Sequence, residues 1–279
     1  MQPATPAPTH DTTAHTEVVD IAIGRAHPAR MQDFLLCGKN HYRADRAAAE
    51  AMTEQLPALR RMVRANRTFI GATVRHLVIG CGVRQFLDIG SGFPTAAGSV
   101  HDVAQGIDSR ARVVYVDNDP IVAAHARALL IGEPAGKAVF VEGDARDPKV
   151  LLADPDVFGT LDRSEPIAVM LTSVLAHFTD EHAHELVRTV LDVLPAGSYL
   201  TISHPTADFD PTAVTGAAVA AEEAGLSYRP RSRVEVAEFF TGLDLVAPGV
   251  VPMLAWRPPP HAPADVRSVH YWVGMGCTS

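Results

Sequence analysis

Hydrophobic residues recur at helical spacing over the first part of the chain. Between residues 59 and 77 the apolar positions include Leu59, Met62, Val63, Ile70, Val74 and Leu77. This spacing is close to the period of an amphipathic helix. It predicts a helix that Pro57 can open in its first turn and that Gly80 and Gly82 end, after a short helix over 30–36 and a second one over 44–56.

The pattern changes at Gln85, where short apolar runs begin to alternate with helical segments. We expect strands near 85–89, 112–117, 138–142, 166–172 and 198–203, and helices near 96–105, 120–131, 179–194 and 211–225. The run at 166–172 has no charged residue, which is typical of a central parallel strand buried on both faces. The alternation predicts an α/β fold, in which a mostly parallel sheet has helices on both faces.

The two ends of the chain have patterns of their own. Residues 1–15 are rich in Pro, Ala and Thr and offer little apolar surface to bury, so we expect a disordered tail. Near the other end, a short helix over 236–240 precedes strand candidates at 245–251 and 269–273. Because Pro and Gly interrupt the first of these candidates, we expect a hairpin at the sheet edge. The predicted parts are the tail, a helical segment over 16–82 and an α/β core over 83–279.

The strongest functional signal is a glycine turn after the first strand, Asp88-Ile89-Gly90-Ser91-Gly92, followed by Asp117 at the end of the second strand. In open α/β sheets, glycines at the strand ends let the backbone approach a ligand, and an acidic residue accepts hydrogen bonds from a ribose. Asp144, after the third strand, can accept from an adenine amine. Each feature alone has an ordinary explanation, as a turn, a helix cap or a solvated carboxylate. Together, at three successive strand ends, they predict a site for an adenosine-containing cofactor.

The residue at position 95 distinguishes between two such cofactors. A dinucleotide fingerprint requires Gly or Ala there, so that the helix packs closely on the strand, whereas this chain has Thr95 after a proline. The turn therefore lacks an obvious cradle for a pyrophosphate. A wider turn with only Gly90 and Gly92 suits S-adenosylmethionine, whose methionine portion would lie against the backbone of these glycines.

These segments resemble an actinobacterial family of S-adenosylmethionine-dependent methyltransferases that was formerly catalogued as a domain of unknown function, DUF574. The resemblance covers residues 26–275 and is carried by the stretches 30–39, 85–95, 112–120, 197–200 and 237–240. It implies a Rossmann-like class I methyltransferase sheet of seven strands, of which the last is antiparallel. It also implies that the helices over 16–82 form an N-terminal lid that folds over the site.

The glycine motif and the resemblance together predict the residues of the cofactor site, to which the lid would contribute Arg30 and the Gly38 loop. The full set is Arg30, Gly38, Asp88, Gly90, Ser91, Gly92, Thr95, Asp117, Asn118, Asp144, Ala145 and Thr172. The chain departs from the family pattern at Cys37, where glycine is usual, and at 40–42, where Asp-Asn-Phe is usual. Its segment 172–178 is also one residue longer. These departures lie where the acceptor should enter.

Methyl transfer requires a well-positioned acceptor and, for some acceptors, a base. His177, just after the fourth strand, is the best-placed candidate base, and Tyr42 is the second. The alternatives are a histidine fixed by a structural hydrogen bond and a tyrosine that packs the lid on the sheet. The chain lacks the Asp/Asn-Pro-Pro-aromatic motif of amide- and adenine-nitrogen methylation. Thr172 stands where a magnesium-dependent catechol enzyme has a carboxylate, so we expect no metal.

The composition of the chain limits the classes of molecule that it is expected to bind. The 279 residues carry a formal net charge of −8, which disfavours nucleic acid and anionic membranes, and the three cysteines form no metal or disulfide pattern. We expect a cytoplasmic protein without nucleic-acid or membrane partners and, by analogy only, a homodimer. The expected acceptor is a small molecule of secondary metabolism. Some members of the resembled family methylate carbon 3 of the indole ring in tryptophan-derived cyclic dipeptides, so such an indole is the substrate hypothesis.

Two other functions share part of this pattern. A nicotinamide-dependent reductase would use Asp117 in the same way, but the missing third glycine and the lack of a Tyr-x-x-x-Lys pair weigh against it. A regulatory protein that binds S-adenosylmethionine without catalysis would keep the glycine turn but have no acceptor pocket behind Tyr42 and His177.

Overall fold

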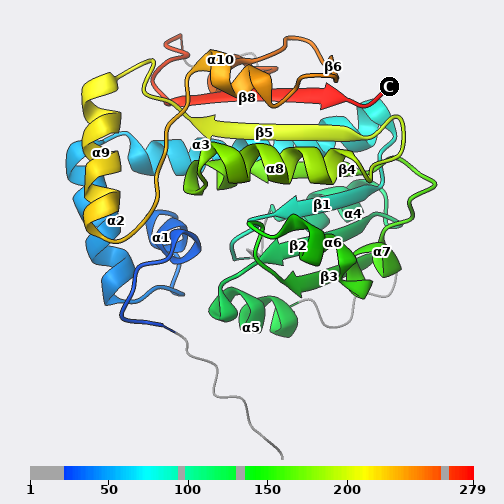
Figure 1. The fold of residues 1–279 in the computed structure, drawn as a ribbon, viewed down its shortest axis with the longest axis horizontal. Coiled ribbons are helices and arrows are strands. Elements are labelled where there is room, and N and C mark those ends of the chain that lie inside the picture. Colours follow the sequence, from blue (N-terminus) through cyan, green and yellow to red (C-terminus); the bar gives the residue numbers. More distant parts are fainter. Residues whose placement is uncertain (1–21, 94–97, 130–135, 259–263) are drawn as a thin grey trace, which may run out of the picture.

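The computed structural model describes residues 22–93, 98–129, 136–258 and 264–279. Within these ranges the chain forms one mixed β-sheet with helices on both faces (Figure 1). The tail predicted over 1–15 lies outside the described residues.

Five parallel strands form the centre of the sheet. They are β1 (Gln85–Ile89), β2 (Arg112–Asp117), β3 (Lys137–Glu142), β4 (Ala168–Thr172) and β5 (Tyr199–Pro205). β8 (Tyr271–Cys277) runs antiparallel to β5, and the short strands β6 (Asp244–Leu245) and β7 (Val251–Pro252) pair with β8. The strand order is β3-β2-β1-β4-β5-β8-β6, with β7 off this path. The predicted α/β, Rossmann-like sheet is confirmed, with one short strand more than the seven expected.

The order of the strands places the ligand site. From β1 the chain proceeds outward through β2 and β3, and then returns to the other side of β1 with β4 and β5. Beyond the carboxyl ends of β1 and β4 the connections diverge, which leaves a crevice in which open α/β sheets bind ligands.

The strand predicted over 245–251 is split into β6 and β7. Pro248 has no N–H to donate to a neighbouring strand, and the chain turns there, with the Gly249 N–H donating to Val246 O at 2.9 Å. The edge of the sheet is therefore formed by two short pairings with β8 in place of one continuous strand.

The strand predicted over 269–273 begins at Tyr271 and continues to Cys277. Glycine is unfavourable inside strands, but Gly274 and Gly276 have a packing role here. A Cβ at Gly274 would lie 2.9 Å from Phe240 Cε2, and one at Gly276 would lie 2.9 Å from Leu243 Cβ. The two glycines leave room for these side chains, so the strand passes through them.

Helices cover both faces of the sheet. α3 (Leu59–Cys81) and α4 (Val100–Ile107) pack on one face, and α6 (Pro148–Ala153), α7 (Pro155–Thr160) and α8 (Asp180–Leu191) on the other (Figure 1). Successive strand residues alternate between the two faces: Phe86 and Met170 join the apolar cluster beside α3, while Leu87 and Val169 join the one beside α8. Because α6 and α7 have six residues each, they carry too little periodicity to be predicted.

The remaining helices lie beside the outer strands or beyond the tips of the parallel strands (Figure 1). α5 (Pro120–Leu129) packs beside β3, α9 (Pro211–Glu223) packs on α2 (Arg43–Gln55), and α10 (Arg233–Glu238) lies beside β8. α1 (Pro28–Leu35) lies beyond the tips of the parallel strands, toward which their arrowheads point in Figure 1. The three predicted N-terminal helices, α1, α2 and α3, are thus present, and α1 stands over the predicted site. No helix in the described ranges is long and apolar enough to cross a membrane.

Candidate active site

The glycine turn after β1 is bonded to the end of β2 and packs against the loop after β4. Gly90 has a φ of 72°, and a Cβ at this position would lie 2.3 Å from Val174 Cγ2, so the turn admits only glycine. The Gly90 and Ser91 N–H groups donate to Val116 O at 2.8 and 3.1 Å. The turn is therefore fixed to the end of β2, with its backbone free of side chains where a ligand can approach.

Asp117 links this turn to the next one. One of its carboxylate oxygens accepts from the Gly92 N–H at 2.9 Å, and the other accepts from the Asp119 N–H at 3.1 Å. The residue is 6% exposed, and burial raises the pKa of its carboxyl above the usual range. A ribose diol would supply hydrogen-bond donors that offset the cost of burying this charge. Asp117 therefore fits the role predicted for it.

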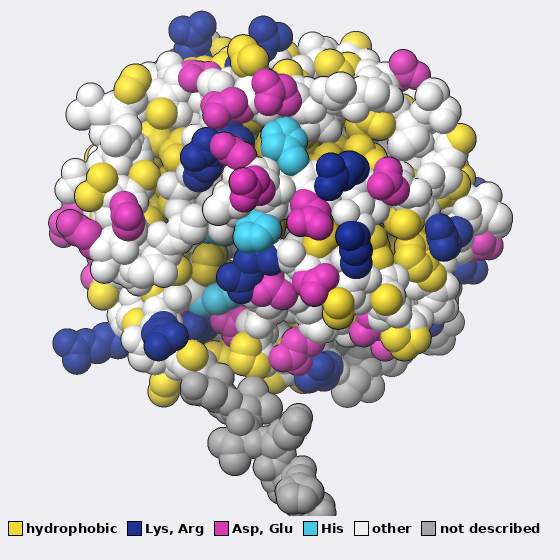
Figure 2. Space-filling model, in the orientation of Figure 1, with side chains coloured by type: hydrophobic (Ala, Val, Ile, Leu, Met, Phe, Trp, Pro, Cys, Tyr) yellow, Lys and Arg dark blue, Asp and Glu magenta, His cyan; other side chains and the backbone are white. Residues whose placement is uncertain are grey.

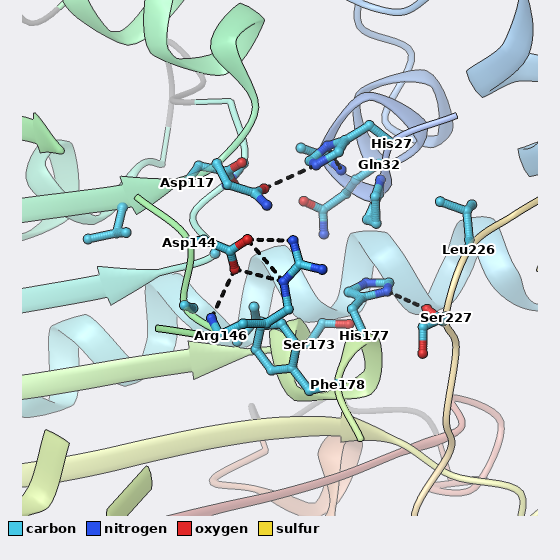
Figure 3. Close-up of a pocket in the computed structure, with 18 of the residues that line it drawn as sticks. His27, Gln32, Asp117, Asp144, Arg146, Ser173, His177, Phe178, Leu226 and Ser227 are labelled. Carbon is cyan, nitrogen blue, oxygen red and sulfur yellow. Dashed lines mark hydrogen bonds and ion pairs between the residues drawn. The ribbon is translucent and has the colours of Figure 1, made fainter. Parts of the chain in front are cut away.

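A cavity of about 380 Å³ opens in front of these groups. Its walls come from α1, the glycine turn, the ends of β2 and β3, the loop after β4, and the segment 225–227 after α9 (Figure 3). The predicted residues that line it are Gly90, Gly92, Asp117, Asn118, Asp144, Ala145, Thr172 and His177. Its volume is within the range of cofactor pockets. One cavity therefore brings together the ends of four parallel strands, β1 to β4, and the candidate base.

Asp144 lies at the end of the cavity beyond β3. The Arg146 guanidinium holds its carboxylate through Nε, 2.9 Å from both oxygens, and through a further contact of Nη2 (Figure 3). This hydrogen bonding keeps the pKa of Asp144 below its usual range. Asp144 is therefore an ionised acceptor, which suits the binding of an adenine amine.

Helix α1 is attached to the loop that follows Asp117. His27 caps the helix and lies 3.1 Å from Asp119 Oδ2 through Nδ1 and 3.2 Å from Asn118 Oδ1 through Nε2. Arg30, 3% exposed, lies 2.9 Å from the same Asp119 oxygen and 3.5 Å from Asp45 of α2. These contacts hold α1 and α2 over the cavity.

His177 ends the short 3-10 helix η1 (Val174–His177) that follows β4. Its Nδ1 lies 2.8 Å from Ser227 O (Figure 3). Because a carbonyl oxygen only accepts, Nδ1 carries the proton, and in the neutral ring Nε2 keeps its lone pair. Burial lowers the pKa of the imidazole below its ordinary value, so the ring is neutral at neutral pH. His177 is therefore prepared to accept a proton at Nε2.

Arg231 holds η1 in place. Its guanidinium donates to Leu175 O at 2.8 Å and to Phe178 O at 3.1 Å, and it pairs with Asp180 at 2.9 Å. The residue is 2% exposed. Arg231 thus binds both ends of the segment that carries His177, although its position in a loop flanked by proline gave no sequence signal for burial.

Five predicted residues lie outside the cavity wall, so the cofactor contacts of four of them and the role of Tyr42 as a base stay predictions. Arg30 and Gly38 belong to the lid, and Gly38 packs so closely that a Cβ would lie 2.0 Å from Asp33 Oδ1. Ser91 turns its hydroxyl to Gly92 O at 3.2 Å. Tyr42 caps α2 and lies beneath the Arg30 guanidinium, 5.7 Å from the ring centroid. The predicted Thr95 lies outside the described residues.

The fifth of these residues, Asp88, is buried in β1 just before the glycine turn, and burial raises its pKa to about 7. The positive charge of Arg67 on α3 opposes this shift, and the negative charge of Asp117 adds to it. Asp88 therefore shapes the electrostatics behind the turn without reaching the cavity.

Several cavity residues were not predicted. His27 and Gln32 come from α1, Arg146 from the loop after β3, and Leu226 and Ser227 from the loop after α9. The pair His27-Pro28 is a readable helix start. By contrast, the loop after α9 has no periodic pattern, and its contact with His177 joins residues that are 50 positions apart.

The fold and the cavity define a class of protein: a class I, Rossmann-like α/β enzyme with a site for an adenosine-containing cofactor at the switch of strand order. The chain matches the model of the S-adenosyl methyltransferase family over residues 14–279. It therefore belongs to that family. It is an S-adenosylmethionine-dependent methyltransferase, and S-adenosylmethionine is its cofactor.

Two crystal structures are similar over nearly the whole chain. A DUF574 family protein of Streptomyces avermitilis is 38% identical, with 93% of this chain and 100% of that chain covered and a TM-score of 0.89. A protein of Thermobifida fusca, assigned as a methyltransferase, is 33% identical, with 95% and 100% covered and a TM-score of 0.85. No curated protein matches the chain. The comparisons give no support to a nicotinamide-dependent reductase or to a non-catalytic binding protein.

Proposed function

We propose that this methyltransferase acts on a neutral small-molecule acceptor and that His177 accepts the proton that the acceptor loses. The observation that carries the proposal is the hydrogen bond from His177 Nδ1 to Ser227 O. It fixes the tautomer in which Nε2 is the basic atom, on a ring that lines the cofactor cavity.

The residues of the cavity fit the cofactor. Gly90 and Gly92 offer backbone without side chains, Asp117 offers acceptors for two hydroxyl groups, and Asp144 offers an ionised acceptor farther along. When bound, S-adenosylmethionine supplies a methyl group on a positively charged sulfur. The protein's part is to hold the acceptor in line, to exclude water and to take up the proton.

The cavity is uncharged on the side of His177. There its wall is formed by Thr172, Ser173, Val174, Phe178 and Leu226, whereas the carboxyl groups of Asp117 and Asp144 and the Arg146 guanidinium lie on the cofactor side. On the face of the molecule that Figure 2 shows, Lys and Arg side chains are interspersed with Asp and Glu side chains, and no broad basic surface for nucleic acid is visible among the described residues there. Both features favour a neutral organic acceptor over a charged or polymeric one.

Within this class, a secondary metabolite with an indole ring is the acceptor that we carry forward from the family resemblance. Methylation of indole carbon 3 in a tryptophan-derived cyclic dipeptide requires an oriented ring and removal of the ring N–H proton. A neutral His177 supplies the second requirement.

The test combines binding and turnover. Calorimetry should show S-adenosylhomocysteine binding to the wild-type protein, and mass spectrometry should detect methyl transfer to indolic cyclic dipeptides. The variant His177→Gln should lower kcat by about 10²–10⁴-fold while the affinity for S-adenosylhomocysteine stays within about threefold. His184→Gln, which changes an exposed histidine of α8 outside the cavity, is the matched control.

The outcomes separate the parts of the proposal. Unchanged turnover in His177→Gln would show that His177 is not the base. Absence of methyl transfer to every indolic cyclic dipeptide, with S-adenosylhomocysteine bound, would refute that acceptor.

A further inference from the structure

A second, smaller cavity of about 70 Å³ adjoins the cofactor cavity. The two share Gln32, Ser173 and His177 among their walls. The other walls are largely apolar and come from α1, α2, α3 and α9, with the side chains Met31, Leu35, Met52, Leu59, Val63 and Ala221. No Asp, Glu, Lys or Arg of the described residues lines this space, which we call the inner chamber.

Two tyrosine hydroxyls interrupt the apolar lining of the inner chamber. The Tyr271 hydroxyl is paired with Ser173 Oγ at 2.9 Å. The Tyr228 hydroxyl is buried, and among the described residues it has no hydrogen-bond partner. A buried hydroxyl without a hydrogen-bond partner lowers the stability of the fold, and a ligand that supplies the partner removes this cost. Burial raises the pKa of Tyr228 well above the ordinary value for tyrosine, so the group remains an O–H donor. What it lacks is an acceptor.

Tyr228 and the candidate base are close together. The ring centroids of His177 and Tyr228 are 6.4 Å apart. The same short loop places both, because the carbonyl of Ser227 holds the His177 ring and the next residue is Tyr228. The chamber itself is smaller than a cavity that holds a whole ring, so a ligand ring beside His177, where the two cavities meet, can extend only a small group such as an oxygen atom into the chamber toward this donor.

We propose that the inner chamber, in continuation of the methyl transfer proposed above, is the acceptor subsite, and that it selects a neutral, largely apolar molecule whose carbonyl oxygen accepts a hydrogen bond from Tyr228. A carboxylate or an ammonium group is excluded, because the chamber offers no countercharge. An acceptor without such an oxygen leaves the Tyr228 hydroxyl unpaired, and this loss is the basis of the selection.

A matched pair of probes tests the selection. Acetophenone and α-methylstyrene have nearly the same planar shape and differ in a C=O against a C=CH₂ group. Each is titrated by ligand-observed NMR into protein saturated with S-adenosylhomocysteine. Acetophenone should bind the wild-type protein about tenfold more tightly than α-methylstyrene, as expected for one hydrogen bond to a buried donor.

The variant Tyr228→Phe removes only the hydroxyl. It should weaken acetophenone binding by about tenfold and leave α-methylstyrene binding no weaker. Tyr199→Phe is the matched control, since Tyr199 begins β5 at the opposite end of that strand from the site, and neither probe should be affected. Thermal melting and calorimetry with S-adenosylhomocysteine confirm that both variants are folded and hold the cofactor product.

Three results would overturn the acceptor subsite while the cofactor assignment stands: no binding of acetophenone to the wild-type protein, equal binding of the two probes, or equal weakening of both in Tyr228→Phe. A failure of S-adenosylhomocysteine to bind would instead count against the proposed function. The two ideas therefore fail in different measurements.

Discussion

The most direct test of the cofactor site is the substitution Asp117→Asn. In the wild-type protein each carboxylate oxygen accepts one backbone N–H, from Gly92 at 2.9 Å and from Asp119 at 3.1 Å. Asparagine keeps the shape but has one oxygen, so one of these N–H groups would face an NH₂ group. The ribose would lose its charged acceptor at the same time.

The size of the effect follows from this geometry. A hydrogen bond to a charged group is worth about 1.5–3 kcal/mol, and a neutral one about 1 kcal/mol. If the ribose keeps only one of its two hydrogen bonds, and that one is neutral, binding should weaken by about 2–5 kcal/mol, or about 30- to 4,000-fold in Kd. Loss of a buried charge offsets part of the cost of the stranded N–H, so folding should change less than binding.

Calorimetry with S-adenosylhomocysteine measures the change in Kd, and thermal melting shows whether the variant is folded. Asp192→Asn is the control, because it removes the same charge from an exposed position at the end of α8. If folded Asp117→Asn binds S-adenosylhomocysteine as tightly as the wild-type protein, Asp117 does not bind the ribose and the orientation of the cofactor has to be revised.

Three further predictions concern strain and protonation. Cys37 has a φ of 65°, a conformation that glycine adopts without strain, so Cys37→Gly should raise the free energy of unfolding by about 0.5–1 kcal/mol in urea titrations; equal or lower stability would contradict this. Because burial lowers the pKa of His177, kcat should be constant at and above pH 7 and fall only below about pH 6.5; a fall that begins above pH 7 would exclude His177 as the base. Burial raises the pKa of Asp88 to about 7, so the folded state binds the proton more tightly than the unfolded state, and this contribution to stability is lost as pH rises from about 4 to 7. Relative to the wild-type protein, Asp88→Asn should therefore gain stability over that interval, by at most about 1.4 kcal/mol per pH unit, and no relative gain would show that the carboxyl is ionised throughout.

The parts of the fold that the sequence predicted are those in which local pattern and tertiary structure agree. β1 to β5 are apolar runs bounded by turn residues. The turn after β1 needs a positive φ at position 90, and the glycine at that position is visible in the sequence. The bounds of the last strand, expected over 269–273, were wrong because a residue distant in the sequence determines how far the strand continues. β8 continues through Gly274 because the Phe240 side chain needs the space, and nothing near Gly274 in the sequence indicates that.

The same limit applies to the candidate site. Asp117 ends β2, and His177 lies in the short segment that follows β4, so the places of both were readable from the strand pattern. Arg231 is a charged residue in a loop, a pattern typical of the surface, yet it is buried, with its charge paired with Asp180 and its N–H groups donating to the carbonyls of Leu175 in η1 and of Phe178 after it. Tyr228 is a candidate site residue because its hydroxyl is buried without a hydrogen-bond partner among the described residues, a property that the sequence does not indicate. Long-range contacts of irregular loops leave no period in a sequence.

Helix α1 is the element that relates the two halves of the site. Its first turn is held by Asn118 and Asp119, which directly follow the residue predicted to bind the ribose. Its buried face contributes Met31 and Leu35 to the inner chamber. The loop predicted to hold the adenosine end of the cofactor and the wall proposed to shape the acceptor subsite are thus joined by the His27 and Arg30 contacts, through less than three turns of helix. Transfer between two small molecules requires that their sites be fixed relative to each other, and in this protein a short helix with a buried ion pair at its first turn meets that requirement.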